Sequence, residues 1–297
     1  MLYFGGKSAI APLVWEALGQ PAHYLEPFFG SGAVLLARPF YDPGHHTETV
    51  CDADGHLANV WRSLQAAPDE VARWCDWPVN HADLSARRKR LREATGVLLE
   101  QLVADDDYYN AKLAGYWIWA TSCWIGNEML KTKDGIPHLS PGGKGVHASS
   151  THAPLTDGAP GVQEPYNTSL YVWFRRLSER LRNVRVVCGD WTRVCGGNWQ
   201  DNEGNAGIFF DPPYGVSDRD DGLYDHDSLT VSADVEAWAL ERGERSTYRM
   251  VVAGYEGEHD GLTKAGWRVK EWKTGGGYSN QGKGENLNRV RERLWFS

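Results

Sequence analysis

Residues 23–32 read His-Tyr-Leu-Glu-Pro-Phe-Phe-Gly-Ser-Gly, and they decide the fold that the sequence predicts. A short strand is indicated over His23–Glu26, and it ends at Pro27 because proline cannot continue a ladder of backbone hydrogen bonds. Gly30 and Gly32 permit a tight turn and a close approach of a ligand to the backbone. A helix is predicted after the turn. Strand, glycine turn and helix in this order are typical of a doubly wound α/β sheet.

The alternation of strands and helices continues along the chain, except in its middle. The other predicted strands are Thr49–Asp52, Val184–Cys188, Gly207–Phe210, Met250–Ala253, Trp267–Trp272 and Arg293–Phe296, the last two as a pair at one sheet edge. The predicted helices on the same parts of the chain are Pro12–Leu18, one that begins at Ala33, Leu57–Leu64 and one that begins at Leu170. Strands that alternate with helices predict a mainly parallel sheet.

The middle of the chain follows a different pattern. Leucines recur every seven residues at Leu84, Leu91 and Leu98, which indicates a helix. A second helical stretch, rich in tryptophan, runs over Tyr108–Ile125. Residues Ser140 to Gly161 show no periodic pattern of apolar residues and consist mainly of Gly, Ser, Thr, Pro and His. This composition predicts a mobile loop.

A chain of 297 residues has the length of about two domains. We therefore expect an α/β catalytic domain formed by residues 1–65 and 169–297. A mainly helical domain, residues 66–168, is expected to interrupt it. The balance of 41% apolar and 24% charged residues is that of an ordinary globular protein and excludes a fibrous or largely disordered chain.

Composition also bears on location and partners. The longest apolar run, Leu113–Ile125, is too short to span a bilayer, and residues 1–20 lack the pattern of a secretory signal. The five cysteines are scattered without a Cys-x-x-Cys pair, which argues against a disulfide framework and against a structural zinc site. We expect a cytoplasmic protein with no membrane partner and no metal ion.

Two acidic residues mark the ends of the first two predicted strands. A carboxylate at the tip of the second strand, here Asp52, is where doubly wound sheets bind ribose hydroxyls. The third glycine of the dinucleotide fingerprint is missing, because Leu35 and Leu36 stand in that region, and the chain has no phosphate-binding P-loop sequence. With Glu26 at the end of the first strand, the site suits a ligand that has a ribose and a positive charge. S-adenosylmethionine has both.

The strongest motif is Asp211-Pro212-Pro213-Tyr214, directly after the apolar segment Ile208–Phe210. The prolines end the strand and hold the backbone carbonyls rigidly. An exocyclic amine of a nucleobase is a poor nucleophile because its lone pair is delocalised into the ring. A carboxylate and a carbonyl that accept its two hydrogens would localise that lone pair, and a neighbouring aromatic ring can stack on an extruded base.

Together, these motifs resemble a known family. Tyr-x-Gly-Gly-Lys at residues 3–7, Glu-Pro-Phe-x-Gly-x-Gly at 26–32, a strand that ends in Asp52, and the Asp-Pro-Pro-Tyr tetrapeptide follow one another in the order of the Dam-type, alpha-group DNA adenine methyltransferases. The resemblance implies a Rossmann-like S-adenosylmethionine-dependent methyltransferase sheet with an inserted target-recognition domain. It also implies double-stranded DNA as partner, a monomer or weak dimer, and a bacterial or phage-infected cell.

The resemblance implies a role for each matching residue. The implied cofactor-binding residues are Tyr3, Lys7, Glu26, Pro27, Phe28, Phe29, Gly30, Ser31, Gly32, Asp52, Asp190 and Trp191. The implied catalytic residues are Asp211, Pro212, Pro213 and Tyr214. Trp124 to Asn127 resemble a family segment that touches DNA, Lys131 and Lys133 follow this segment as further predicted DNA contacts, and Arg289–Phe296 resembles the closing strand. Residues 66–168 match the family poorly outside residues 116–140, so the DNA sequence that the family recognises cannot be transferred to this chain.

Charge is distributed unevenly along a chain whose net charge is -8. Basic residues crowd between Arg87 and Arg92, and we predict that Arg87, Arg88 and Arg90 contact DNA phosphates on the helix face opposite the leucines. A solvated helix face with no partner is the alternative. The acidic stretch Asp218–Asp227 is unusual beside a polyanion, and no role is assigned to it.

Other readings remain open. The same chemistry suits the exocyclic amine of cytosine, an RNA base or a glutamine side chain, because Asp-Pro-Pro-Tyr does not separate these acceptors. A DNA-binding relative that has lost catalysis is a further alternative, against which the intact tetrapeptide argues.

Overall fold

The centre of the computed structural model is a β-sheet. Its strands, in chain order, are β1 (His23–Glu26), β2 (Thr47–Asp52), β3 (Val184–Cys188), β4 (Ala206–Phe210), β5 (Tyr248–Tyr255), β6 (Arg268–Glu271) and β7 (Glu292–Phe296). The structure describes residues 7–124, 129–131, 136–137, 145–146, 170–197, 204–213, 230–272 and 292–297.

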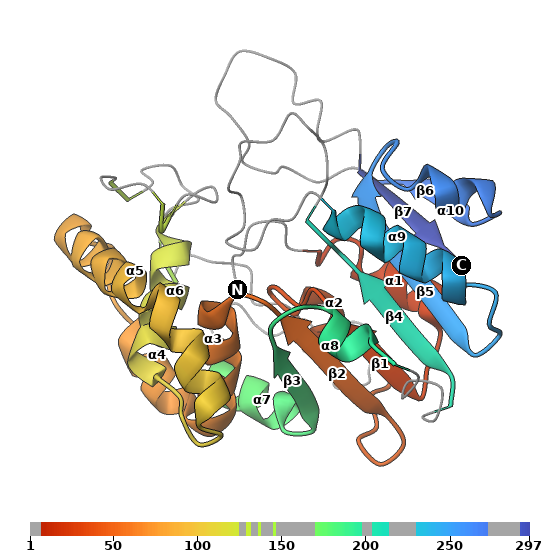
Figure 1. The fold of residues 1–297 in the computed structure, drawn as a ribbon. Coiled ribbons are helices and arrows are strands. Elements are labelled where there is room, and N and C mark those ends of the chain that lie inside the picture. Colours follow the sequence, from red (N-terminus) through yellow and green to blue (C-terminus); the bar gives the residue numbers. More distant parts are fainter. Residues whose placement is uncertain are drawn as a thin grey trace.

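The strands of this described part hydrogen-bond in the order β3-β2-β1-β4-β5-β7-β6 (Figure 1). The strands from β3 to β5 are parallel, whereas β7 lies antiparallel to both β5 and β6. The direction in which strands are added to the sheet reverses between β1 and β4. Strands β2 and β3 follow β1 on one side, and β4 and β5 are added on its other side. Such a switch point is where open α/β sheets bind ligands, beyond the carboxyl ends of the strands.

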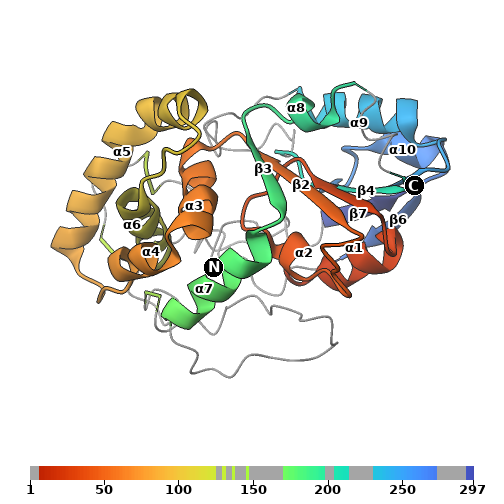
Figure 2. The ribbon, with the colours of Figure 1, turned by 90° about the horizontal axis from the view of Figure 1, so that it is seen from below.

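Helices cover both faces of the sheet. They are α1 (Ala11–Leu18), α2 (Ala33–Leu36), α3 (Gly55–Ala66), α4 (Pro68–Cys75), α5 (His81–Ala104), α6 (Ala111–Ser122), α7 (Leu170–Leu181), α8 (Thr192–Cys195), α9 (Val231–Arg242) and α10 (Asp260–Lys264). Figure 2 shows α8 and α9 on one face and α1 and α2 on the other, with α3 to α6 gathered beyond β3. The expected α/β class is therefore confirmed as a mostly parallel sheet flanked by helices, an arrangement compatible with a Rossmann-like fold.

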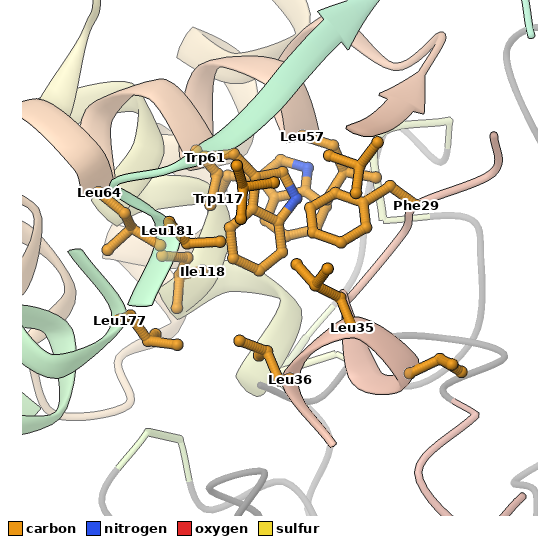
Figure 3. Packing of buried hydrophobic residues seen from close by; sticks show 14 of the residues in the cluster. Phe29, Leu35, Leu36, Leu57, Trp61, Leu64, Trp117, Ile118, Leu177 and Leu181 are labelled. Carbon is orange, nitrogen blue, oxygen red and sulfur yellow. The ribbon is translucent and has the colours of Figure 1, made fainter. Parts of the chain in front are cut away.

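Two apolar cores fill the spaces on either side of the sheet. One lies under α8 and α9 and contains Trp191, Phe210 and Trp295. The other begins under α1 and α2 and continues through α3 and α7 into α4 and α6. In Figure 3, Trp61 of α3 lies among Phe29, Leu57 and Trp117, while Leu177 and Leu181 of α7 lie close to Leu64 and Ile118.

This continuous core joins the two parts that the sequence predicts. Helices α4 to α6 belong to the predicted insertion, yet they pack on α3 and α7 of the predicted catalytic part. The boundaries after residue 65 and after residue 168 remain a prediction. Within the described residues, no helix combines the length and the apolar character that crossing a bilayer requires.

Candidate functional site

The candidate site lies where parallel strands end, around the switch point between β1 and β4. Glu26 is the last residue of β1, Asp52 is the last residue of β2, and Asp211 directly follows β4. Because carboxyl ends of parallel strands meet at one edge of a sheet, the register brings these three acidic residues together. The sequence therefore placed them correctly at strand ends.

Two glycines shape the turn after β1. Gly30 and Gly32 have φ values of 48° and 66°, in the left-handed region that glycine enters at little cost. A Cβ atom on Gly32 would lie 2.8 Å from the ring of Phe29. Trp61 braces the turn from α3, because its indole N–H donates to the Gly30 carbonyl at 3.2 Å and its ring centroid lies 4.8 Å from that of Phe29.

Asp52 ties this turn to the end of β2. Its Oδ2 accepts a hydrogen bond from the Gly30 amide at 2.8 Å, and its Oδ1 accepts one from the Asp54 amide at 2.9 Å. The Phe29 amide also donates to the Cys51 carbonyl at 2.9 Å. The carboxylate is thus fixed in a half-buried position beside the half-buried Gly30, where it can accept hydrogen bonds from hydroxyl groups.

Glu26 is more deeply buried than its sequence position suggests, with an exposed fraction of 3%. Its Oε2 accepts hydrogen bonds from the Tyr24 hydroxyl at 2.9 Å and from the Leu35 amide at 3.2 Å. Burial raises the pKa of Glu26 well above its usual range, and the negative charge of Asp211 acts in the same direction. Burial therefore disfavours the charged form of this carboxyl group.

Asp211 is paired with the side chain of Lys7. The Lys7 ammonium lies 3.0 Å from Asp211 Oδ1, and the exposed fractions of the two side chains are 9% and 19%. The same ammonium lies 6.0 Å from the ring centroid of Trp272. Pro212 is buried and Pro213 is half-buried, so surrounding atoms restrict the backbone directly after β4. The resemblance implies a cofactor contact for Lys7, and the structure shows its pairing with Asp211.

Glu292 is a site residue that the sequence reasoning missed. It is the first residue of β7 and lies opposite Tyr255, the last residue of β5, at the same edge of the sheet as Asp211. Burial raises the pKa of Glu292 to about 7; the positive charge of Lys7 acts against this rise and the negative charge of Asp211 acts with it. Its place just ahead of the predicted strand Arg293–Phe296 was the only available signal.

An aromatic wall adjoins the ends of β1 and β4. Trp191 is buried, and its ring centroid lies 6.2 Å from that of Phe28 and 6.2 Å from that of Phe210. Asp190 is exposed, and its Oδ1 accepts hydrogen bonds from the Thr192 amide, at 3.0 Å, and from the Thr192 hydroxyl. An exposed carboxylate next to a flat apolar surface can bind the polar edge and the face of an aromatic ligand.

The predicted DNA contacts divide into buried and exposed side chains. Arg87 and Arg88 have exposed fractions of 7% and 1%, so the prediction that they contact phosphates is wrong for this arrangement. The physical reason is helical spacing, since these arginines follow Leu84 by three and four residues and share its face. Arg90 and Lys131 are exposed, and Trp124 is half-buried beneath Arg88.

Several predicted site residues lie outside the described part of the chain. These are Tyr3, Asn127, Lys133 and Tyr214, together with most of residues 140–161 and the acidic stretch 218–227. Comparison of the chain with protein-family models and with curated proteins finds no match. What the site does must therefore be argued from its own residues.

Proposed function

We propose that the protein is an S-adenosylmethionine-dependent methyltransferase that acts on the exocyclic N6 amine of adenine in DNA. The observation that carries the proposal is the position of Asp211-Pro212-Pro213 at the carboxyl end of β4, beside the switch point. The carboxylate that would bind the acceptor and Asp52, which would bind the ribose, then lie at the same edge of the sheet.

The residues around the switch point fit the cofactor. A Cβ atom on Gly32 would obstruct the turn after β1, and Asp52, which accepts from the Gly30 amide, would offer carboxylate oxygens to ribose hydroxyls. Phe28, which is half-buried and packs beside the buried Trp191, would offer its ring to the adenine. S-adenosylmethionine supplies an electrophilic methyl group when it is bound. Its positive charge would favour the ionised form of Glu26, whose pKa burial raises.

The acceptor half of the site suits an amine with two hydrogens. The Asp211 carboxylate accepts one hydrogen and the Pro212 carbonyl accepts the other, which localises the lone pair on nitrogen. Neither proline has an N–H that would compete for these acceptors. Asp211 is held by its ion pair with Lys7 and Pro212 is buried, and groups positioned before the substrate arrives are a main source of electrostatic catalysis.

DNA as the acceptor rests on the resemblance and on exposed basic residues. The target base must leave the duplex to reach Asp211, which requires base flipping. Arg90 and Lys131 are exposed in the helical part, where they can contact phosphates. Cytosine N4, an RNA base and a glutamine side chain remain alternative acceptors, and a catalytically silent DNA-binding protein remains the alternative from another class.

Methyl transfer from tritiated S-adenosylmethionine to DNA tests the proposal. We expect Asp211→Ala to lower the rate by on the order of 10²-fold or more, because one preorganised acceptor is lost. Cofactor affinity, measured by calorimetry, should change little. Asp106→Ala is the matched control, since Asp106 is exposed in a turn of the helical part.

Digestion of the labelled DNA to nucleosides identifies the acceptor. Label in N6-methyl-2′-deoxyadenosine supports the proposal, whereas label in N4-methyl-2′-deoxycytidine identifies cytosine as the acceptor. Near-normal transfer by Asp211→Ala would refute the assignment of Asp211. Absence of transfer by the wild-type chain, together with tight DNA binding, would favour the silent relative.

A further inference from the structure

Three carboxyl groups project from the same edge and the same face of the sheet. Successive side chains of a strand alternate between its faces, so residues two apart share a face. Glu26 follows Tyr24 by two residues, Asp211 follows Phe209 by two, and Glu292 precedes Leu294 by two. Tyr24, Phe209 and Leu294 all belong to the apolar core under α1 and α2. Lys7, just ahead of α1, joins this group through its ion pair with Asp211.

Glu292 has acceptor capacity that the described residues do not use. Its Oε2 is buried and has no hydrogen-bond partner among the residues that the structure describes. The positive charge of Lys7 and the negative charge of Asp211 both act on its carboxyl group. A buried carboxylate oxygen without a donor is costly, so a donor is expected to occupy it in some functional state.

The ion pair in this structure conflicts with the role proposed for Asp211. An ammonium 3.0 Å from Oδ1 draws electron density from the carboxylate and competes with an acceptor amine for its oxygens. Asp211 becomes a stronger acceptor for the amine when Lys7 turns to another carboxylate. Glu292 is a described carboxyl group on which the charges of both members of the pair act.

We propose that Glu292 is a positioning residue that takes the Lys7 ammonium from Asp211 when Asp211 accepts a hydrogen of the acceptor amine. This role rests on the function proposed above. No covalent bond changes, since the lysine moves between two acceptors and keeps its charge. Only the ionised carboxylate of Glu292 can hold the ammonium in a buried setting, so the exchange requires Glu292 to lose its proton.

The titration of Glu292 depends on groups from each described element around it. Lys7 and Asp211 act from the segments before α1 and after β4, and Tyr255 lies opposite on β5. On β7 itself, the Arg293 guanidinium lies 3.2 Å from Glu256 and 3.3 Å from Glu271, so these two exposed carboxylates offset its charge. Ionisation of Glu292 at about pH 7 therefore couples mainly to the Lys7–Asp211 pair.

Glu292→Gln tests the role through the pH profile of methyl transfer. The wild-type kcat should rise with pH through about 7 as Glu292 ionises. The variant should lose this rise and show a kcat lower by on the order of 10²-fold at pH 8, with KM values nearly unchanged, because misplacement of catalytic groups acts on the chemical step. Glu271→Gln is the matched control, since its side chain is 72% exposed. A variant with the wild-type profile and kcat overturns the proposal.

Side-chain NMR provides a readout that does not need activity. The carboxyl carbon of Glu292, assigned by its disappearance in Glu292→Gln, should titrate near pH 7 in the wild type. Its midpoint should fall in Asp211→Asn, which removes a negative charge, and rise in Lys7→Gln, which removes a positive one. If the wild type is active but neither substitution changes the titration midpoint of Glu292, the role proposed for Glu292 is refuted and the proposed function is not. If the wild type transfers no methyl group, the proposed function fails, whatever the midpoints are.

Discussion

Gly32 shows how a single residue shapes the candidate site. Its φ of 66° lies in the left-handed region, and a Cβ atom there would meet the Phe29 ring at 2.8 Å. Phe29 in turn packs against Trp61, so neither ring can move away freely. Gly96 in α5 is the opposite case, because its surroundings leave more than 4 Å for an added Cβ atom.

The two glycines should respond oppositely to alanine. Gly32→Ala should lower the free energy of unfolding by about 1–3 kcal/mol, since it combines a left-handed backbone with a steric clash. Gly96→Ala should raise it by about 0.5–1 kcal/mol, because alanine favours an exposed helix position. Urea denaturation measures both. Equal effects of the two substitutions would contradict the constrained turn.

The sequence predicts which chemical groups stand at strand ends, but not how they pair. Asp52 and Asp211 follow from the ends of apolar segments, and a local pattern suffices for that. The Lys7–Asp211 pair joins residues that are far apart in the chain, and the raised pKa values of Glu26 and Glu292 arise from burial. Such properties depend on tertiary packing, which a local pattern does not contain.

At the scale of an element, α5 shows a helix face that combines leucine with arginine. Arg87 donates to the Trp74 carbonyl at 3.0 Å, and its guanidinium lies 4.3 Å from the ring centroid of Trp119 and 4.5 Å from that of Tyr116. Aromatic faces and a carbonyl thus replace water around this charge. Arg90, on the other side of the helix, is exposed.

Arg87→Ala and Arg90→Ala should therefore differ in kind. Arg87→Ala should lower the free energy of unfolding by roughly 2–4 kcal/mol, from lost cation–π contacts and an unpaired carbonyl. Arg90→Ala should change stability by less than about 0.5 kcal/mol. If Arg90 contacts a phosphate, its loss should reduce the log–log salt slope of DNA affinity by about 0.9.

Urea denaturation and salt titrations of DNA binding measure these two effects separately. Arg87→Ala serves as the control for the salt slope, which it should leave unchanged once the fraction of folded protein is accounted for. A slope reduced by Arg87→Ala and not by Arg90→Ala would restore the sequence-based view of the basic cluster.

Strands were predicted more completely than helices. Each predicted strand exists within a few residues, since apolar segments bounded by proline, glycine or aspartate are distinctive. The helices α4, α8, α9 and α10 were not predicted. The short α8 and α10, with four and five residues, carry too few residues for a period of 3.6 to show.

At the scale of the whole molecule, buried titratable groups link stability to pH. His259 is fully buried, and its ring lies edge-on to Trp295 of β7 with centroids 4.9 Å apart. Its Nδ1 lies 3.4 Å from Glu236 of α9. Burial lowers the pKa of His259 to about 4, so the folded protein favours the neutral ring.

His259 should make the protein sensitive to acid. Since its pKa is lower in the folded state than in the unfolded state, its contribution to stability is present above pH 6.5 and is lost as the pH falls toward 4. Between these values His259→Gln should remove up to about 3 kcal/mol of pH dependence. Denaturation at several pH values measures this, with the exposed His81→Gln as control. Parallel curves for wild type and His259→Gln would contradict the prediction.

The order of the strands was beyond local prediction. The sequence indicates a mainly parallel sheet, which the structure confirms, and it places the last two strands together at an edge. It does not reveal that β7 enters between β5 and β6, because antiparallel pairing there is set by which apolar faces meet. The continuity of the core from the sheet into α4 and α6 was equally hidden.

The position of β1 between β2 and β4 has a consequence for protein synthesis. The Ala22 amide donates to Asn205 across 183 residues. The side of β1 that pairs with β4 therefore has to wait without its partner strand until the intervening chain has been synthesised. At the pace of a ribosome this wait is roughly 10–40 s. During that time an apolar strand edge, with Tyr24 and Leu25 beside it, is open to wrong partners. The nascent chain is therefore expected to engage chaperones until β4 emerges, and the crevice at the switch point can form only after that.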